Sequence, residues 1–226
     1  MRWALEPAPG VPRMLDLAAG TGKLTATLAA IGADVTAVEP DPAMLAELRR
    51  LLPGVRALAG TAEDIPLPDG SVDAVLVGQA LHWFDMAVAG PEIHRILAPG
   101  GVLAGLWNLD DDRVDWVAGL EEVSEKSASV TVSDWQTQAS EAHLAQIDLA
   151  GMFEPVESAG FPHGQLRTAD SLLATIATHS RLLVMKDGER SALLSRIRDY
   201  LRERPETADG EFILPMVTGV LRTRRR

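Results

Sequence analysis

The amino-acid sequence predicts an α/β fold with a doubly wound, mostly parallel seven-stranded sheet. Short apolar runs alternate with amphipathic segments along the first half of the chain, which is typical of parallel strands joined by helices. The first apolar run leads directly into a glycine-containing turn, as in open sheets that bind ligands at their strand ends. The last run contains Pro215, which a central strand tolerates poorly, so we expect an antiparallel strand near the C-terminus, at or near an edge.

Apolar spacing and capping residues predict the first two β-α units. Residues 13–18 form a buried strand, followed by a helix that ends at Gly32 and whose apolar positions are Leu24, Leu28 and Ile31. Residues 34–39 form the next strand. Asp41 can cap the following helix, with Pro42 at its first position. Its apolar stripe comprises Met44, Leu45, Leu48, Leu51 and Leu52.

The remaining elements are predicted in the same way. Strands are expected at 55–60, 72–78 and 102–107, with a helix from about Pro91 and a turn at 98–101 before the last of them. From Asp110 through Gln146 the pattern changes to helices and loops. A sixth strand region is expected at 153–161 and a closing strand at 211–223. The amphipathic helix between them is marked by Leu193, Leu194, Ile197, Tyr200 and Leu201.

Composition narrows the class of ligand. The 226-residue chain has 32 acidic and 21 basic residues, a net charge of −11 that disfavours nucleic acid and anionic membranes as partners. The basic run 222–226 is expected to be a solvated tail. The chain has no cysteine, no leader-like N-terminus and no run of about 18 apolar residues. These features predict a soluble cytoplasmic protein that binds a small molecule.

The turn after the first strand is typical of nucleotide sites, and its spacing separates three ligand classes. A P-loop is excluded because Gly22-Lys23 is followed by Leu24. The dinucleotide pattern G-x-G-x-x-G fits Gly20 and Gly22 but has Thr25 at its third position, which weakens that interpretation. Glu39 lies 19 positions beyond Gly20, at the end of the second strand, where a carboxylate can accept hydrogen bonds from both ribose hydroxyls of an adenosine.

Five motifs in order give a family resemblance. The stretches LDLAAGTGKLT, VTAVEPDPAML, GTAEDIPLPDGSVDAV, QALHWFD and EIHRILAPGGVLA resemble the motif series of the class I S-adenosylmethionine-dependent methyltransferases. The closer likeness is to the small-molecule branch that includes trans-aconitate methyltransferase-like proteins. The resemblance is strong over 13–108 and implies a Rossmann-like sheet. It also implies a single domain over 1–226, with a cofactor-binding half at 1–108 and substrate-covering helices and closing strands at 109–226.

The resemblance assigns residues to the cofactor, S-adenosyl-L-methionine, and to its product S-adenosyl-L-homocysteine. The family pattern D-x-G-x-G-x-G falls on Asp16, Ala18, Gly20 and Gly22, so alanine replaces the first glycine, and we expect an ordinary φ there. Glu39 matches the ribose-binding acid, and Ala62 and Glu63 match the adenine-side segment. The implied cofactor-binding set is Asp16, Ala18, Gly20, Thr21, Gly22, Glu39, Pro40, Met44, Ala62, Glu63, Gln79 and Trp83.

Methyl transfer from an activated donor depends mainly on alignment, so few catalytic groups are required. His82 is the candidate general base for a hydroxyl acceptor; the alternative is a packing or hydrogen-bonding role. Trp83 is either a wall beside the sulfonium or a core aromatic. His94 is expected to be structural. His143, His163 and His179 share no spacing, and His179 is the best candidate for a substrate pocket.

The predicted function is methyl transfer to a small-molecule acceptor. No metal is expected, because the aspartates 110–112 have no partner His or Glu placed by sequence. Nucleobase methylation is disfavoured because GQALHW stands where related enzymes carry an Asn/Asp-Pro-Pro-aromatic motif. Two alternatives remain open: a non-catalytic S-adenosylmethionine-binding protein and an NAD-dependent Rossmann oxidoreductase. The short segment before the first strand implies a lid from 110–150 or from a neighbouring subunit, and the sequence leaves the oligomeric state open.

Overall fold

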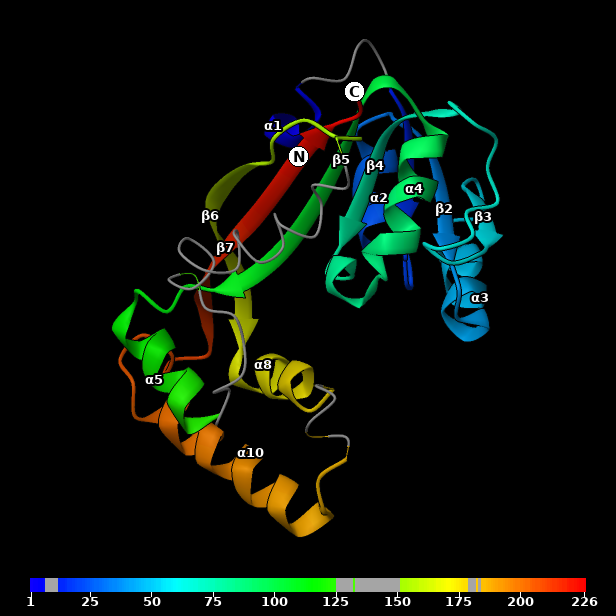
Figure 1. Cartoon of the computed structure of the whole chain (residues 1–226). Coiled ribbons are helices and arrows are strands. Elements are labelled where there is room, and N and C mark those ends of the chain that lie inside the picture. Colours follow the sequence, from blue (N-terminus) through cyan, green and yellow to red (C-terminus); the bar gives the residue numbers. More distant parts are fainter. Residues whose placement is uncertain (7–11, 125–131, 133–150, 179–181, 183) are drawn as a thin grey trace. The chain divides into compact units, whose positions relative to one another are not determined.

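The computed structural model describes residues 1–6, 12–124, 132, 151–178, 182 and 184–226. Seven strands form one sheet. They are β1 (Arg13–Leu17), β2 (Asp34–Glu39), β3 (Arg56–Ala59), β4 (Val72–Gly78), β5 (Leu97–Asp110), β6 (Glu157–Thr168) and β7 (Glu211–Arg224). Their order across the sheet is β3-β2-β1-β4-β5-β7-β6, which confirms the predicted fold class (Figure 1).

Helices connect these strands. In the described residues they are α1 (Arg2–Leu5), α2 (Lys23–Ala30), α3 (Pro42–Leu51), the 3-10 helix η1 (Leu81–Trp83), α4 (Met86–Ile96), α5 (Asp115–Val123), α8 (Ala169–Ile176) and α10 (Asp187–Arg202). None of the helices in these ranges is long and apolar enough to cross a membrane. The chain divides into two compact units. The first comprises Met1–Trp107, Gln138–Ala159 and Gly219–Arg226, and the second comprises Asn108–Thr137 and Gly160–Thr218.

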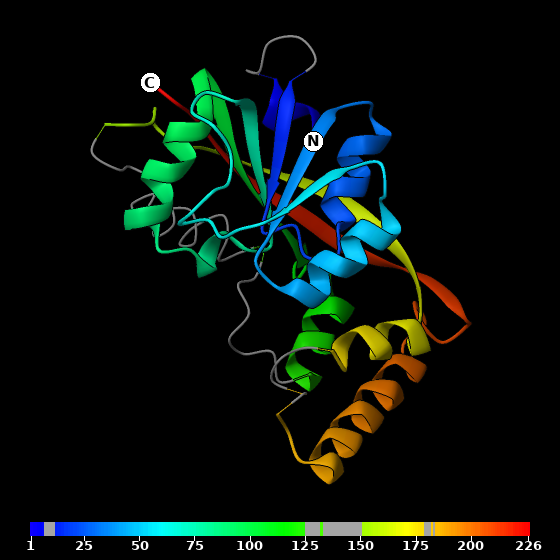
Figure 2. The ribbon, with the colours of Figure 1, turned by 90° about the vertical axis from the view of Figure 1, so that its right-hand side faces the viewer.

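The order of the parallel strands fixes which helices share a face. Strands β1 to β5 pair in parallel, with Asp16 opposite Ala37 and Leu15 opposite Val75. The chain moves from β1 to β2 and β3 in one direction and from β4 to β5 in the other. Because such crossovers are right-handed, the two directions put their helices on opposite faces. Figure 2 shows α2 and α3 on one face and α4 on the other.

Strand β7 runs antiparallel to β5. The amide of Asp111 donates to the Pro215 carbonyl at 3.0 Å, and the amide of Arg225 donates to the Gly101 carbonyl at 2.8 Å, so residue numbers rise along one strand as they fall along the other. The outermost strand is β6, so β7 lies one strand in from the edge. The predicted sixth strand begins later than expected, at Glu157.

The basic C-terminal run begins within β7, which ends at Arg224, and Arg225 forms an isolated bridge with Phe153, so the expectation of a solvated tail is wrong. The Arg222 side chain is only 10% exposed; its guanidinium lies 3.9 Å from the centre of the Trp3 ring and 2.8 Å from Glu157. Arg224 pairs with Glu154 at 2.8 Å, and Arg225 donates to the Leu97 carbonyl. These partners are far away in sequence, which is why the local pattern indicated a tail.

Two further boundaries differ from the prediction. Helix α4 begins at Met86 because the Asp85 carboxylate accepts the Ala87 amide at 3.1 Å, and Pro91 lies inside the helix rather than at its start. The expected turn at 98–101 is a bulge within β5, where the pairing register shifts and Gly100 has φ +75°. In the predicted apolar stripes, Ile31, Met44 and Leu51 are exposed by about half.

The second unit has its own hydrophobic core, built where α5, α8 and α10 meet strand residues. The Tyr200 hydroxyl donates to the Trp116 carbonyl at 2.8 Å, and Phe212 packs edge-on against the Trp116 ring. A Cβ atom on Gly119 would lie 2.3 Å from the Tyr200 hydroxyl oxygen. Glycine is therefore required in α5 for Tyr200 to reach its acceptor.

We expect Gly119→Ala to lower the free energy of unfolding by about 1–3 kcal/mol, because the added methyl overpacks the contact with Tyr200. Urea denaturation measures the change. The matched control is Gly188→Ala in α10, where nothing lies within 4 Å of the added Cβ. Equal effects of the two variants would contradict the assigned contact.

Candidate functional site

The turn between β1 and α2 is a compact reversal held by backbone hydrogen bonds. The Ala19 amide donates to the Val38 carbonyl at 3.0 Å, and the Gly22 amide donates to the Ala19 carbonyl at 2.9 Å. Gly20 has φ +58°, and Gly22, the N-cap of α2, has φ +87°. A Cβ on Gly22 would lie 2.9 Å from the Leu48 side chain, so this glycine also lets the turn pack against α3.

The prediction that Ala18 takes an ordinary φ is wrong. Its φ is +57°, in the left-handed region. The chain reverses immediately after β1, so the residue at this position must adopt the conformation that the family's glycine adopts freely. A residue with a Cβ pays roughly 1–2 kcal/mol for that conformation.

We therefore expect Ala18→Gly to raise the free energy of unfolding by about 1 kcal/mol, since glycine removes the left-handed strain. Chemical denaturation without cofactor is the measurement. Ala26→Gly, inside α2, is the control and should be destabilising, because glycine there loses helix propensity. Destabilisation of similar size in both variants would argue against strain at Ala18.

Glu39 joins the end of β2 to this turn. Its side chain is buried, and one carboxylate oxygen accepts the Gly20 amide at 2.7 Å while the other accepts the Asp41 amide at 2.8 Å. Asp41 in turn caps α3 by accepting the amides of Ala43 and Met44. Each oxygen of Glu39 keeps a second lone pair, so the carboxylate can still accept a ligand hydroxyl.

Asp16, at the end of β1, has one carboxylate oxygen without a partner. Its Oδ2 accepts the Thr25 hydroxyl at 2.6 Å, whereas Oδ1 is buried and has no hydrogen bond. Burial raises the pKa of Asp16 to about 7, and the nearby negative charge of Glu39 adds to the rise, while the Thr25 hydrogen bond opposes it. A buried, unpaired carboxylate oxygen calls for a donor, and a cationic ligand would supply one.

The other predicted residues at this end follow β2 and start α3. Thr21 is partly buried within the turn, and Pro40 is exposed. Met44 is 48% exposed, and its sulfur lies 4.0 Å from the position of a Cβ on Gly20. Thr25 was not predicted as a site residue; its only signal was that it occupies the third glycine position of a dinucleotide pattern.

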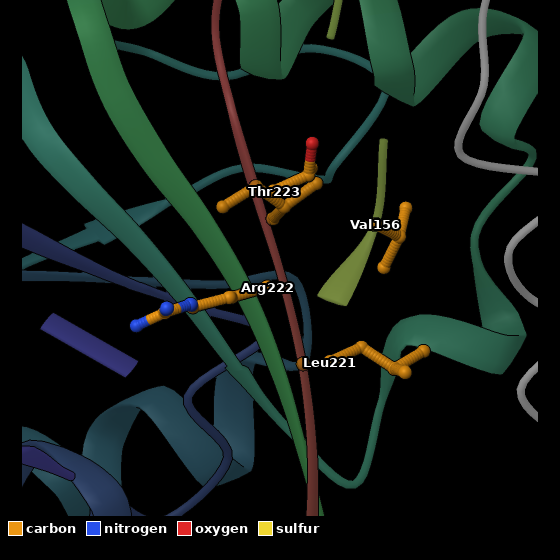
Figure 3. Close-up of a pocket in the computed structure, with 6 residues that line it drawn as sticks. Val156, Leu221, Arg222 and Thr223 are labelled. Atoms are coloured by element: carbon orange, nitrogen blue, oxygen red, sulfur yellow. The ribbon is translucent and has the colours of Figure 1, made fainter. Parts of the chain in front are cut away.

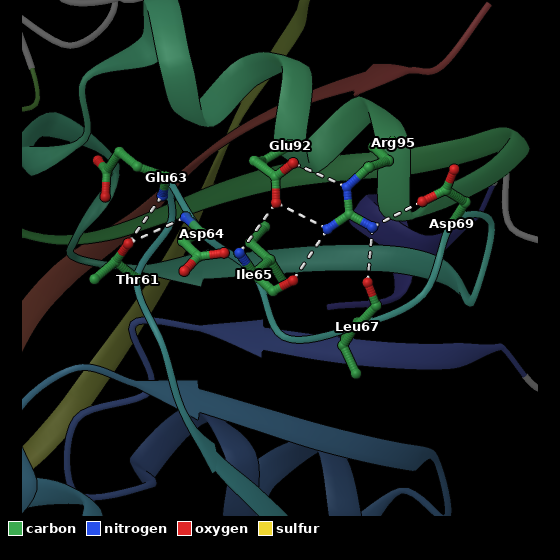
Figure 4. A network of polar contacts seen from close by, with 8 residues as sticks. All are labelled: Thr61, Glu63, Asp64, Ile65, Leu67, Asp69, Glu92 and Arg95. Atoms are coloured by element: carbon green, nitrogen blue, oxygen red, sulfur yellow. Dashed lines mark hydrogen bonds and ion pairs between the residues drawn. The ribbon is translucent and has the colours of Figure 1, made fainter.

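The segment after β3 carries Ala62 and Glu63. Ala62 is buried, and the Thr61 hydroxyl accepts the amides of Glu63 and Asp64 at 3.2 and 3.1 Å (Figure 4). The Glu63 carboxylate accepts the Asp85 amide at 3.2 Å. This hydrogen bond ties the segment to the start of α4.

The segment after β4 carries Gln79, His82 and Trp83. Gln79 has φ +62°, and its amide donates to the Leu106 carbonyl at 2.8 Å. The rings of His82 and Trp83 lie 4.9 Å apart and are tilted by 42°. Trp83 is 78% exposed, so the alternative that it is a core aromatic is wrong.

Backbone strain gathers at the carboxyl ends of two adjacent strands. Among the described non-glycine residues, a positive φ occurs at Ala18 and Gln79, which directly follow β1 and β4. Such conformations are unfavourable and cluster at functional sites, where the surrounding structure enforces them. This edge of the sheet is therefore the candidate site, as expected for open α/β sheets.

The other candidate residues lie apart from this constellation. His94 packs edge-on against Phe153, and burial lowers its pKa. His163 is exposed on β6, and His143 and His179 lie outside the described residues. Asp111 pairs with Arg113 at 2.7 Å. In the part of the chain that the structure describes, no group of three metal-ligating side chains comes together.

A shallow depression is lined by residues of β5 and β7 and by Val156, and none of the predicted site residues lines it (Figure 3). It encloses no volume that a water molecule could occupy. Its lining residues are Leu103, Gly105, Val156, Leu221, Arg222 and Thr223.

Comparison with known proteins identifies the class that this fold and site define. Residues 15–105 match the family model described as a methyltransferase domain, type 11. The chain is 40% identical over 221 residues to an uncharacterized methyltransferase of Mycobacterium tuberculosis, covering 97% of this chain and 85% of that protein. A demethylmenaquinone methyltransferase of Beutenbergia cavernae is 45% identical over 101 residues, which cover 44% of this chain and 42% of that protein.

The solved structures agree. A protein of Anaeromyxobacter dehalogenans, provisionally assigned as a type II methyltransferase, superposes with a TM-score of 0.74 at 25% identity, covering 99% of this chain and 94% of that one. The protein is therefore a methyltransferase that uses S-adenosylmethionine as its cofactor. The chain belongs to the type 11 methyltransferase family.

Proposed function

We propose that this methyltransferase transfers the methyl group of S-adenosylmethionine to a small-molecule acceptor in the cytoplasm. When bound, the cofactor supplies a methyl group that its sulfonium centre already activates. The protein's task is then to bind, orient and exclude water. The acidic chain, with its net charge of −11, supports a small molecule over a nucleic acid as acceptor.

The unpaired oxygen of Asp16 is the observation that carries the cofactor assignment. Asp16 is next to last in β1, Glu39 is last in the adjacent strand β2, and Glu39 accepts the amide of Gly20 in the glycine turn. We assign the buried Oδ1 of Asp16 to the cofactor's ammonium group and the free lone pairs of Glu39 to its ribose hydroxyls. The residues proposed to complete the cofactor site are those of the predicted set, from Ala18 to Trp83.

The segment after β4 is the proposed acceptor side. The exposed Trp83 offers an apolar wall, and His82 beside it is the candidate base for an acceptor that must lose a proton. A carboxylate acceptor would need no base. We further propose that residues 1–226 act as one catalytic domain. The demethylmenaquinone methyltransferase aligns with less than half of this chain. This partial match supports a shared cofactor site but gives no support for a shared acceptor.

The experiment is incubation with methyl-labelled S-adenosylmethionine and a cell extract, followed by identification of the molecules that gain label. We expect label in a low-molecular-weight product and stoichiometric release of S-adenosylhomocysteine. Label confined to nucleic acid or protein would contradict the proposal. Cofactor binding without turnover in any extract would favour a non-catalytic binding protein, and binding of NADH instead would favour an oxidoreductase.

A further inference from the structure

Arg95, on α4, uses every N–H of its guanidinium. Its Nε and Nη2 donate to the two oxygens of Glu92, both at 2.8 Å. The remaining N–H groups donate to the Ile65 carbonyl at 3.0 Å, to the Leu67 carbonyl at 2.8 Å and to the Asp69 carboxylate at 2.8 Å (Figure 4). A guanidinium has five N–H donors, so this side chain is fully committed.

Glu92 and the backbone of Arg95 add further connections to the same loop. The Glu92 carboxylate accepts the Ile65 amide at 3.1 Å, and the Arg95 carbonyl accepts the Gly70 amide at 2.9 Å. The Arg95 guanidinium lowers the pKa of Glu92 and keeps it ionised at neutral pH. Charge-assisted pairs of this fork geometry are the stronger hydrogen bonds of proteins.

The loop held in this way is 60–71, which joins β3 to β4 without regular secondary structure. Ile65 and Leu67 are buried, so the loop is packed as well as bonded. Its opposite end carries Ala62 and Glu63, and Glu63 is bonded to Asp85, the N-cap of α4. Helix α4 therefore fixes the loop at both ends.

We propose that Glu92 and Arg95 are positioning residues that hold segment 61–64 in place for the adenosine part of the cofactor. This inference rests on the proposed cofactor site. Neither residue touches the cofactor in it. Both act by fixing the loop, so that binding does not have to order about a dozen residues.

The test compares two substitutions of the same chemistry. Arg95→Lys removes the paired hydrogen bonds from the guanidinium to the two oxygens of Glu92, together with those to the loop. Arg13→Lys removes an equivalent fork, in which Arg13 donates to both oxygens of Asp73 at 3.0 and 2.8 Å, at the opposite end of β1 and β4. Calorimetry with S-adenosylhomocysteine and with 5′-methylthioadenosine, which lacks the amino-acid part, gives the affinities of the full-length proteins.

We expect Arg95→Lys to weaken the binding of both ligands about tenfold, because binding must then order a loop that the wild-type protein holds in place. Arg13→Lys should leave both affinities within about twofold. Unchanged affinities in Arg95→Lys, equal losses in both variants, or a loss for S-adenosylhomocysteine alone would overturn the inference. If Arg95→Lys does not fold, Glu92→Gln carries the same expectation. Failure of the wild-type protein to bind S-adenosylhomocysteine would instead overturn the proposed function.

Discussion

Glu39→Ala is expected to weaken S-adenosylhomocysteine binding by about 1.5–3 kcal/mol, the range for hydrogen bonds to a charged group, which corresponds to a loss of roughly 10- to 150-fold. Two causes act together. The substitution removes the proposed acceptor of the ribose hydroxyls. It also leaves the amides of Gly20 and Asp41 without their acceptor, which loosens the turn that the cofactor would contact. Isothermal titration calorimetry measures the change.

Glu47→Ala is the matched control for this variant. Glu47 lies on α3 and, among the described residues, forms its ion pair with Arg50 at the surface, so its removal should leave the affinity unchanged. Glu39→Gln should fall between the two, because an amide keeps one acceptor oxygen. Wild-type affinity in Glu39→Ala would remove Glu39 from the site.

Local signals were sufficient for the parallel core of the sheet. Strands β2 and β4 have the bounds that the sequence predicted. Strand β4 is a nearly continuous apolar run, and β2 carries the buried apolar residues Val35, Ala37 and Val38 directly before Pro40. Helix α3 starts as predicted because its cap is local: Asp41 accepts the amides two and three positions ahead, and Pro42 follows it. These choices depend on neighbours within one turn.

Elements that depend on distant partners could not be predicted. Arg222 is held by Trp3 and Glu157, more than 60 residues away, so its burial has no local signal. The start of α4 is a separate case, because its N-cap Asp85 is a local signal that the prediction of a helix from about Pro91 leaves out. Proline is a typical first residue of a helix, but Pro91 lies inside α4, where its missing N–H leaves one helical hydrogen bond unmade.

The candidate site divides in the same way. The spacing from Gly20 predicted that Glu39 lies at the end of the second strand, and the family resemblance assigned Asp16 to the cofactor. The structure places both residues on adjacent parallel strands. The sequence could not indicate that Arg95 pairs with the carbonyls of Leu67 and Ile65, 28 and 30 positions earlier, and with the carboxylate of Asp69, 26 positions earlier. Nor could it indicate the left-handed φ of Ala18, which is dictated by the path of the turn.

Asp16→Asn is expected to stabilise the fold above neutral pH and to weaken binding of the cofactor. The carboxyl has an ordinary pKa of 3.8 and a folded-state pKa of about 7. Between these values the folded state holds a proton that the unfolded state has lost, so the free energy of unfolding falls as pH rises from about 4 to 7 and is then level. A pKa difference of one corresponds to about 1.4 kcal/mol, so ionisation of Asp16 lowers the free energy of unfolding by at most about 4 kcal/mol.

Asparagine does not titrate, so the variant lacks this dependence. At pH 8 we expect the free energy of unfolding of the variant to be about 2 kcal/mol higher than that of the wild type. At pH 4 we expect no increase, because the buried amide still lacks a partner. Urea denaturation from pH 4 to 8 follows the difference. Asp209→Asn, at an exposed position, is the control and should show no such trend.

The same variant tests the ligand assignment, because stability and binding should move in opposite directions. Loss of the carboxylate removes the proposed acceptor of the cofactor's ammonium, so affinity for S-adenosylhomocysteine should drop about tenfold or more at pH 8. In wild type the affinity should improve from pH 6 to 8, since binding at the lower pH requires Asp16 to release its proton. A variant that is more stable and binds normally would mean that Asp16 is a buried structural acid. Normal binding would also leave the unpaired Oδ1 without the ligand assigned to it.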